Sequence, residues 1–357
     1  MKIGFDIGIA SLRGTHIAIY DYASCNQSIL GNESLLFYQK SDKHQISSFE
    51  KFKNKFHLIP YTDQAELNHL AEINKIDRFY LIKSGEKDSY VLSSTPNLIH
   101  AVFPQKIKER HGDIYAFVSE WLSEEYSNGL ISFVPHIVRL PSHDLDLRQE
   151  LTIPSEAIVF AYHGGADSFN LNFVRKVIQD IVEKNKHIFF MFMNIPSFLD
   201  HPQLIFLPGT SNIDYKVKFI NTANAMIHAR GIGESFGIAC GEFSIKNKPI
   251  FTYALSPQQS HINILGQRGI LYKGPKELLR LISDFDPKWA SSKNWDCYSE
   301  KFSPKLVMEK FKSVFLDADI NHKNDINENF FDKFHIQSNR VIRKARSLSR
   351  KYYLYFD

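Results

Sequence analysis

Short apolar segments, each followed by a helical or polar stretch, recur along most of this chain of 357 residues. The opening segment 2–7 leads into a loop of small residues and an apolar-periodic stretch from His16 to Tyr22, which predicts a strand, a loop and a helix. Further strands are expected at residues 34–38, 56–59, 79–82, 97–103, 115–119 and 129–134. This alternation favours a mostly parallel sheet covered by helices.

A second series of the same kind begins after a mixed-charge stretch between Pro135 and Pro154. Its strands are predicted at residues 157–162, 187–193, 204–207, 225–229 and 249–253, and its helices at 172–184, 214–223 and 238–244. A chain of this length is too long for one ordinary core. We therefore predict an α/β protein with two similar halves facing one another, at residues 1–148 and 149–316, and a C-terminal extension at 317–357.

Composition excludes several classes of protein. Hydrophobic residues make up 43% and charged residues 23% of the chain, which is close to the average of globular proteins and argues against disorder. A net charge of +4 is far below that of a dedicated nucleic-acid binder. The three cysteines, Cys25, Cys240 and Cys297, are odd in number and widely spaced, which argues against a disulfide framework or a zinc cluster. With no apolar run near the roughly 18 residues of a membrane helix, we expect a cytoplasmic protein, soluble or peripherally attached to a membrane.

Two glutamates in the second series carry the strongest chemical signal. Seven residues separate Glu234 from Glu242, and Ser235-Phe236-Gly237-Ile238 follows the first. If a helix begins near Phe236, its free N–H groups and positive dipole end can hold a phosphate or a sugar hydroxyl. Glu242 can then accept hydrogen bonds from a diol such as a ribose. The spacing fits equally well a plain helix whose first glutamate complements the dipole and whose second glutamate is exposed.

The segment from Arg230 to Thr252 resembles the donor-site signature of retaining glycosyltransferases with two facing Rossmann-like domains (the GT-B fold), family 4 in particular. The resemblance is carried by Glu234-Ser235-Phe236-Gly237, Glu242 and Asn247-Lys248-Pro249-Ile250. It implies a donor site in the cleft between the domains. Glu234 would lie against the hydroxyls of the transferred sugar, Glu242 would bind the ribose, and residues 235–238 would lie near sugar and phosphate.

The loop that opens the second domain departs from the commonest pattern of that family. Members usually carry a Gly-Arg pair and a following Lys-Gly pair there, whereas this chain has His163-Gly164-Gly165. A diphosphate still needs compensating charge or N–H groups. Arg230 is our candidate for the substitute cation, and the two glycines would let backbone amides approach the donor. A structural arginine and an ordinary loop are the alternatives.

The first domain offers two further candidate positions. The segment from Gly8 to Thr15 occupies the place where related enzymes have a glycine-containing loop facing the donor phosphates, so Arg13 and Gly14 are assigned to the donor site. A tight strand-to-helix turn is the alternative. His100 lies at an apolar strand, where related enzymes often carry an active-site histidine, and it joins Glu234 as a predicted catalytic residue. A lone histidine there is equally compatible with a structural role.

The resemblance also implies a reaction. The sugar would be transferred from a nucleotide-diphosphate sugar with retention of configuration, and the leaving phosphate would help to deprotonate the acceptor, so no protein nucleophile is required. The protein would position the reactants and stabilise the departing diphosphate. Because the sequence has no Asp-rich metal motif, we predict a metal-independent enzyme with no cofactor beyond the donor, a UDP- or GDP-sugar. A glycan or a lipid- or protein-linked hydroxyl is the expected acceptor, and no nucleic acid is expected as a partner.

Two other functions stay open on the sequence alone. The missing loop arginine and lysine leave room for a non-catalytic protein that binds a nucleotide sugar or a carbohydrate. A nucleotide-sugar epimerase of the same architecture is the other alternative.

The C-terminal extension becomes basic, and we expect it to be helical and to pack back on the first domain. Its basic residues are typical of a solvated helical face, and contact with an anionic membrane surface or an acceptor is the alternative. They are Arg340, Arg343, Lys344, Arg346, Arg350 and Lys351.

Overall fold

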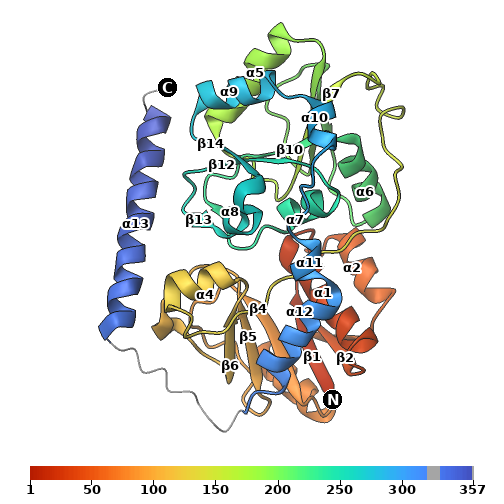
Figure 1. Cartoon of the computed structure of the whole chain (residues 1–357). Helices are drawn as coiled ribbons and strands as arrows, with labels where there is room; N and C mark the ends of the chain where they lie inside the picture. Colours follow the sequence, from red (N-terminus) through yellow and green to blue (C-terminus); the bar gives the residue numbers. More distant parts are fainter. Residues whose placement is uncertain (320–329, 356–357) are drawn as a thin grey trace. The chain divides into compact units, whose positions relative to one another are not determined.

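The structure is a computed structural model that describes residues 1–319 and 330–355 (Figure 1). The chain divides into two compact units. The first unit contains Met1–Ile137 and Phe302–Arg340, and the second contains Val138–Lys301 and Val341–Asp357. Each unit holds one six-stranded parallel sheet, and a further two-stranded sheet lies in the second unit. The predicted α/β class is thereby confirmed.

The sheet of the first unit has the strand order β3-β2-β1-β4-β5-β6. Its strands are β1 (Lys2–Gly8), β2 (Glu33–Gln39), β3 (Leu58–Tyr61), β4 (Arg78–Lys83), β5 (Asn97–Ala101) and β6 (Ile114–Phe117). Helices α1 (Gly14–Ser28), α2 (Ile46–Lys53) and α3 (Gln64–Ile73) connect the strands from β1 to β4, and α4 (Glu120–Ser127) follows β6. Two of these helices begin with a side-chain cap, because Asp63 accepts from the N–H of Glu66 and Ser119 accepts from that of Leu122.

One predicted strand of the first unit is wrong. Residues 129–134 make only an isolated bridge between Phe117 and Phe133. The backbone turns away after α4, because Asn128 and Gly129 both have left-handed φ angles, of 51° and 76°. The segment still bonds to the helix end at Ile131, whose N–H donates to the hydroxyl of Ser127, so only its last residues reach the sheet.

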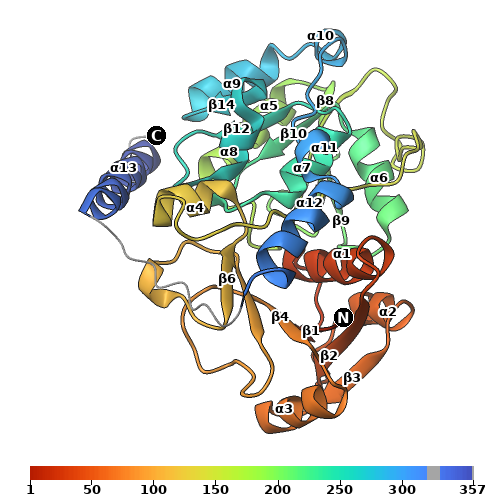
Figure 2. The same cartoon turned by 60° about the horizontal axis from the view of Figure 1, so that its bottom comes forward.

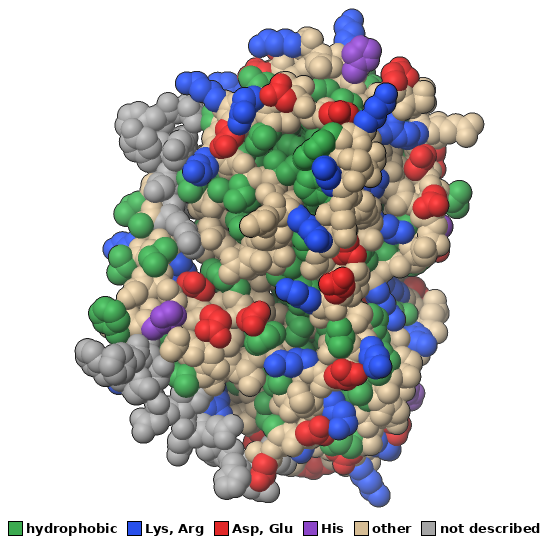
Figure 3. Space-filling view, viewed as in Figure 1, with side chains coloured by type: hydrophobic (Ala, Val, Ile, Leu, Met, Phe, Trp, Pro, Cys, Tyr) green, Lys and Arg blue, Asp and Glu red, His purple; other side chains and the backbone are tan. Residues whose placement is uncertain are grey.

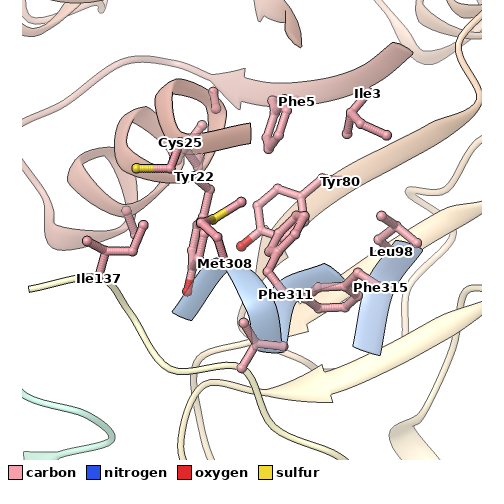
Figure 4. Close-up of a cluster of buried hydrophobic side chains, with 14 of the residues drawn as sticks. Ile3, Phe5, Tyr22, Cys25, Tyr80, Leu98, Ile137, Met308, Phe311 and Phe315 are labelled. Carbon is pink, nitrogen blue, oxygen red and sulfur yellow. The ribbon is translucent and has the colours of Figure 1, made fainter. Parts of the chain in front are cut away.

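The C-terminal part of the second predicted domain packs on the first sheet instead. Phe311 of α12 (Pro304–Phe311) and Phe315 of the following π-helical turn (Lys312–Leu316) join Phe5 and Tyr80 in one buried core (Figure 4). The ring of Phe311 stacks on Tyr22 of α1 with centroids 5.3 Å apart. Aromatic residues four positions apart share one helix face, which explains why this segment covers the sheet beside α1 (Figure 2).

The sheet of the second unit has the order β14-β12-β10-β7-β8-β9. These strands are β7 (Ile158–His163), β8 (Ile188–Met193), β9 (Leu204–Leu207), β10 (Ala225–His228), β12 (Ile250–Tyr253) and β14 (Gly269–Tyr272). The helices of this unit include α5 (Asn172–Lys184), α6 (Ile213–Thr222), α7 (Ile238–Ile245), α8 (Ser260–Leu265), α9 (Pro275–Ser283) and α10 (Pro287–Ser291). The short strands β11 (Gly233–Glu234) and β13 (Gln258–Gln259) pair with each other.

Strand order places a topological switch point in each sheet. In the second unit the chain runs from β7 outward through β8 and β9, then returns to β10 on the other side of β7. In sheets of this kind the loops after the two central strands diverge and leave a crevice at their carboxyl ends, where ligands bind. The equivalent position in the first unit lies between β1 and β4.

Candidate donor site at the switch point of the second sheet

The loops that follow β7 and β10 are tied together at the switch point of the second unit. The side-chain carbonyl of Asn170 accepts a 2.8 Å hydrogen bond from the N–H of Gly231, and the N–H of Asn170 donates to the carbonyl of Ala229. His163 ends β7 and His228 ends β10. The predicted donor residues of the second domain therefore come from two adjacent strand ends and from the helix that follows them.

Glu234 lies in the short strand β11, before the helix α7 that carries Glu242. Its carboxylate accepts from Arg230 Nη1 at 2.7 Å and lies 3.2 Å from His228 Nε2. Its side chain is 15% exposed. Burial by itself raises the pKa of Glu234, but the hydrogen bond from His228 and the charge of Arg230 outweigh burial and hold the pKa at about 2. The site therefore presents an ionised carboxylate whose position is set by two neighbours.

Glu242 is the fifth residue of α7 and is almost fully buried. Lys216 Nζ lies 2.8 Å from one carboxylate oxygen, and His163 Nε2 lies 3.0 Å from the other. Burial tends to raise the pKa of Glu242, but Lys216 and His163 lower it to about 2. The exposed glutamate of the alternative interpretation is thus ruled out, because the Glu242 side chain is 4% exposed.

Lys216 was not identified from the sequence as a residue of the site. It lies in α6 and is itself buried, with a side chain 8% exposed. A signal was present, because Phe219 and Ile220, three and four residues later, place Lys216 on the apolar face of this helix. A lysine on a buried face requires a compensating charge, but the sequence does not say which carboxylate supplies it.

The amino end of α7 lies directly after this cluster. Gly237 is its N-cap with a φ of 90° and, as a glycine, supplies no side-chain cap. A left-handed N-cap of this kind favours glycine. Ser235 and Ile238 are partly exposed, whereas Phe236 is buried against Tyr298. The first N–H groups of α7 therefore receive no hydrogen bond from an N-cap side chain, and helix amino ends of this kind bind phosphate.

Gly164 and Gly165 differ in how much space their surroundings leave for a side chain. A Cβ at Gly164 would lie 2.5 Å from the hydroxyl oxygen of Ser168, so the packing of the loop alone requires glycine there. At Gly165 the nearest atom to a Cβ is 3.3 Å away, on Asp167. The ring of His163 stacks on Phe243 of α7 at 5.6 Å. Packing accounts for Gly164, and an approach of backbone amides to a ligand stays a prediction.

A chain of polar side chains behind Glu234 was also missed in the sequence. Nδ1 of His228 lies 2.9 Å from the hydroxyl of Thr252, which lies 2.9 Å from Nε2 of His261. All three residues are buried, and burial lowers the pKa of His261 to about 3. This chain holds the ring of His228 in a fixed orientation toward Glu234. No spacing rule could have found it, because its members come from β10, β12 and α8.

Two of the predicted donor-site residues of the first unit lie at the start of α1. Arg13 is exposed at the amino end of α1, where it provides no side-chain cap, and Gly14 is the first residue of that helix. Their assignment to the donor site stays a prediction.

His100 is fully buried, and both of its ring nitrogens are engaged. Nδ1 lies 2.6 Å from the Tyr80 hydroxyl, and Nε2 lies 2.8 Å from the carbonyl of Val134. Burial lowers its pKa to about 4. This environment favours the structural interpretation of His100 over a role in contact with substrate.

Within residues 1–319 and 330–355, no three or more His, Cys, Asp or Glu side chains come together in a group that could hold a metal ion. The ionised groups of the site instead neutralise one another in pairs, Arg230 with Glu234 and Lys216 with Glu242.

Solved structures share the fold. The chain is similar to HepE of Anabaena, solved with UDP and glucose, with a TM-score of 0.66 and 12% identity over 89% of this chain and 100% of HepE. It is also similar to WaaG, a glycosyltransferase involved in lipopolysaccharide biosynthesis (TM-score 0.61, 11% identity, 88% of this chain and 100% of WaaG). A UDP-N-acetylglucosamine 2-epimerase gives a TM-score of 0.56 with 9% identity over 92% of this chain and 99% of its own.

Comparison of the sequence with protein-family models and with curated proteins found no match. Identities near 10% show the fold alone. The predicted architecture of two Rossmann-like domains, the GT-B fold, is confirmed, whereas membership of family 4 stays a prediction.

Proposed function

We propose that this protein transfers a sugar from a nucleotide-diphosphate sugar to a hydroxyl acceptor, and that the donor binds at the switch point of the second sheet. One observation carries the proposal: an ionised, partly exposed Glu234, fixed by Arg230 and His228, lies just before the uncapped amino end of α7. That arrangement offers a hydrogen-bond acceptor for sugar hydroxyls beside donors for a diphosphate. The likeness in fold to glycosyltransferase structures supports it.

Each residue of the cluster has a defined part in this proposal. Glu234 accepts hydrogen bonds from hydroxyls of the transferred sugar. Arg230 uses one N–H group for Glu234, and a guanidinium has five, so others can bind the diphosphate. The amino end of α7 adds N–H groups toward the same anion. The site thereby stabilises the negative charge that grows on the leaving diphosphate, which is the main demand of such a transfer.

The finer features of the reaction belong to the same proposal. We infer that transfer retains the anomeric configuration, that the leaving phosphate takes the acceptor proton, and that no metal ion is required. The remaining N–H groups of Arg230 and those at the amino end of α7 support the last inference, because they can donate to a diphosphate without a metal ion. A UDP- or GDP-sugar is the expected donor, and a glycan or a lipid- or protein-linked hydroxyl is the expected acceptor.

Calorimetric titration of UDP, GDP, ADP and their common sugar conjugates tests the site. Arg230→Ala is expected to weaken binding of the preferred nucleoside diphosphate roughly tenfold or more, and that of the matching nucleoside much less, because it removes a charge-assisted contact to phosphate. Arg280→Ala, an exposed arginine in α9, is the matched control and should bind like wild type. Unchanged affinity in Arg230→Ala would remove this arginine from the proposal.

An epimerase is the second candidate, supported by the likeness in fold to a 2-epimerase. Incubation of the bound donor without an acceptor separates the two, because an epimerase converts the donor into an isomer and a transferase yields at most slow hydrolysis. With an acceptor, proton NMR of the product distinguishes retention from inversion. Binding without turnover under both conditions would favour a non-catalytic nucleotide-sugar-binding protein.

A further inference from the structure

The C-terminal helix α13 (Phe330–Tyr355) exposes apolar side chains and buries a charged one. Phe334, Val341 and Leu348 are 63%, 68% and 58% exposed, whereas Arg343 is 9% exposed. A surface helix of a globular protein ordinarily shows the opposite, with its apolar face toward the core. The exposed apolar side of α13 therefore calls for a partner outside the chain.

These apolar side chains form one continuous stripe. At 100° per residue, Phe334, Val341, Ala345 and Leu348 fall within an arc of about 60° around the helix axis. We call these four residues the apolar stripe. The exposed Lys333, Arg340 and Lys344 lie together along one edge of this stripe. An apolar band bordered by cations is the pattern of helices that lie in a membrane interface.

The balance of basic and acidic residues in α13 differs from that in the rest of the chain. Residues 330–355 contain seven lysines and arginines and a single acidic residue, Asp332, whereas the whole chain has a net charge of +4. The remainder is therefore slightly acidic. On the face of the molecule shown in Figure 3, basic and acidic side chains are interspersed. Excess positive charge is thus concentrated in α13.

We propose that α13 binds the surface of an anionic membrane, with the apolar stripe at the boundary of the acyl chains and the flanking cations among the headgroups. The apolar stripe and the flanking cations together favour an anionic membrane over other partners. A nucleic acid would use the cations and leave the stripe exposed, and two copies paired through the stripe would bring together helices of the same charge. No described helix is long and apolar enough to cross a bilayer, so the contact lies at the membrane surface.

Flotation of the full-length protein with lipid vesicles tests the proposal. Vesicles of phosphatidylcholine alone are compared with vesicles that also contain roughly 30% phosphatidylglycerol, an anionic lipid. Wild type is expected to float with the anionic vesicles, and less at high salt. Val341→Ser with Leu348→Ser should lower the partition coefficient roughly tenfold or more, since both apolar side chains lose their acyl contact.

A second pair of substitutions tests the flanking charges. Arg340→Gln with Lys344→Gln should also reduce binding about tenfold, because each basic residue near an anionic surface contributes to affinity. Ile46→Ser with Leu306→Ser replaces two exposed apolar residues of other helices, and Lys53→Gln with Lys55→Gln replaces two other exposed lysines. Both controls should bind as wild type does, which excludes a general effect of polarity or net charge.

Three results would overturn the proposal. The first is wild-type protein that does not float with anionic vesicles. The second is binding that depends on the charges but is unchanged in Val341→Ser with Leu348→Ser, as expected of a general polyanion site. The third is a wild-type dimer, seen by light scattering, that becomes a monomer in this stripe variant while no vesicle is bound. None of these readouts depends on glycosyl transfer.

Discussion

Removing the charge of Glu242 should destabilise the second unit in a pH-dependent way. Lys216 and His163 hold the pKa of this buried carboxyl at about 2, against an ordinary value of 4.5. Each unit of pKa corresponds to about 1.4 kcal/mol, so ionised Glu242 contributes about 3 kcal/mol of folding free energy at pH 7. Glu242→Gln loses this contribution and leaves the Lys216 ammonium buried without its carboxylate, at a total cost of about 3–5 kcal/mol.

The sign of the pH dependence follows from the lowered pKa. A carboxyl with a depressed pKa in the folded state stabilises fully above its unfolded value, and this stability is lost as the pH falls from 4.5 toward about 2. At pH 3.5 the contribution should have fallen to about 2 kcal/mol. The difference in unfolding free energy between wild type and Glu242→Gln should therefore narrow between pH 5 and pH 3.5.

Urea unfolding followed by tryptophan fluorescence measures the effect. Trp289 and Trp295 lie in the second unit, so most of the signal reports on the relevant part of the chain. Lys216→Met added to Glu242→Gln should recover part of the loss, because it removes the orphaned charge. Glu183→Gln, an exposed change in α5, should stay within about 0.5 kcal/mol of wild type. An unchanged midpoint and pH profile in Glu242→Gln would refute a buried ion pair at this position.

Three further outcomes are expected. His100→Phe should lower the free energy of unfolding by about 1–3 kcal/mol in thermal or urea unfolding, because Tyr80 and Val134 lose their partner. Donor turnover per folded molecule should persist. A collapse of kcat with unchanged stability would restore the catalytic assignment of His100. Gly233→Ala should lower the free energy of unfolding by more than about 3 kcal/mol, since its Cβ would lie 1.9 Å from the carbonyl oxygen of Gln258. Gly8→Ala should cost about 1 kcal/mol, because the backbone at Gly8 is also left-handed but a Cβ there would meet open space. Donor turnover should be unaffected by a chelator, and a loss that a divalent ion restores would contradict metal independence.

The neighbours of Glu234 order its side chain before any donor binds. Arg230, His228 and the chain through Thr252 and His261 already hold the carboxylate in place. A ligand that binds there need not pay for ordering that side chain. Glu242 is in a different position, because a ribose could reach its oxygens only by competing with Lys216 and His163. Its predicted contact with ribose is therefore the more demanding of the two.

Local patterns in the sequence determined the class of fold and part of the site. Alternating apolar runs and helical stretches predicted two parallel α/β sheets, because the periods of 2 and 3.6 residues depend only on backbone geometry. The same reasoning brought Glu234 and Glu242 to one region, because both lie in the segment that connects β10 to β12. It assigned residues 129–134 to a strand, since apolar content does not reveal a left-handed turn at Asn128.

Only the tertiary structure decided the partners and the burial of the charged groups. Lys216 meets Glu242 across 26 positions of sequence, and His228 reaches His261 through Thr252 from three different elements. Contacts of this kind depend on strand order and on how helices pack over a sheet, which no short-range pattern contains. The burial of a side chain likewise depends on packing between segments that are distant in sequence. His100 is enclosed by packing from several segments at once, and helical periodicity predicts the stripe of α13 but not the side of the helix that faces solvent.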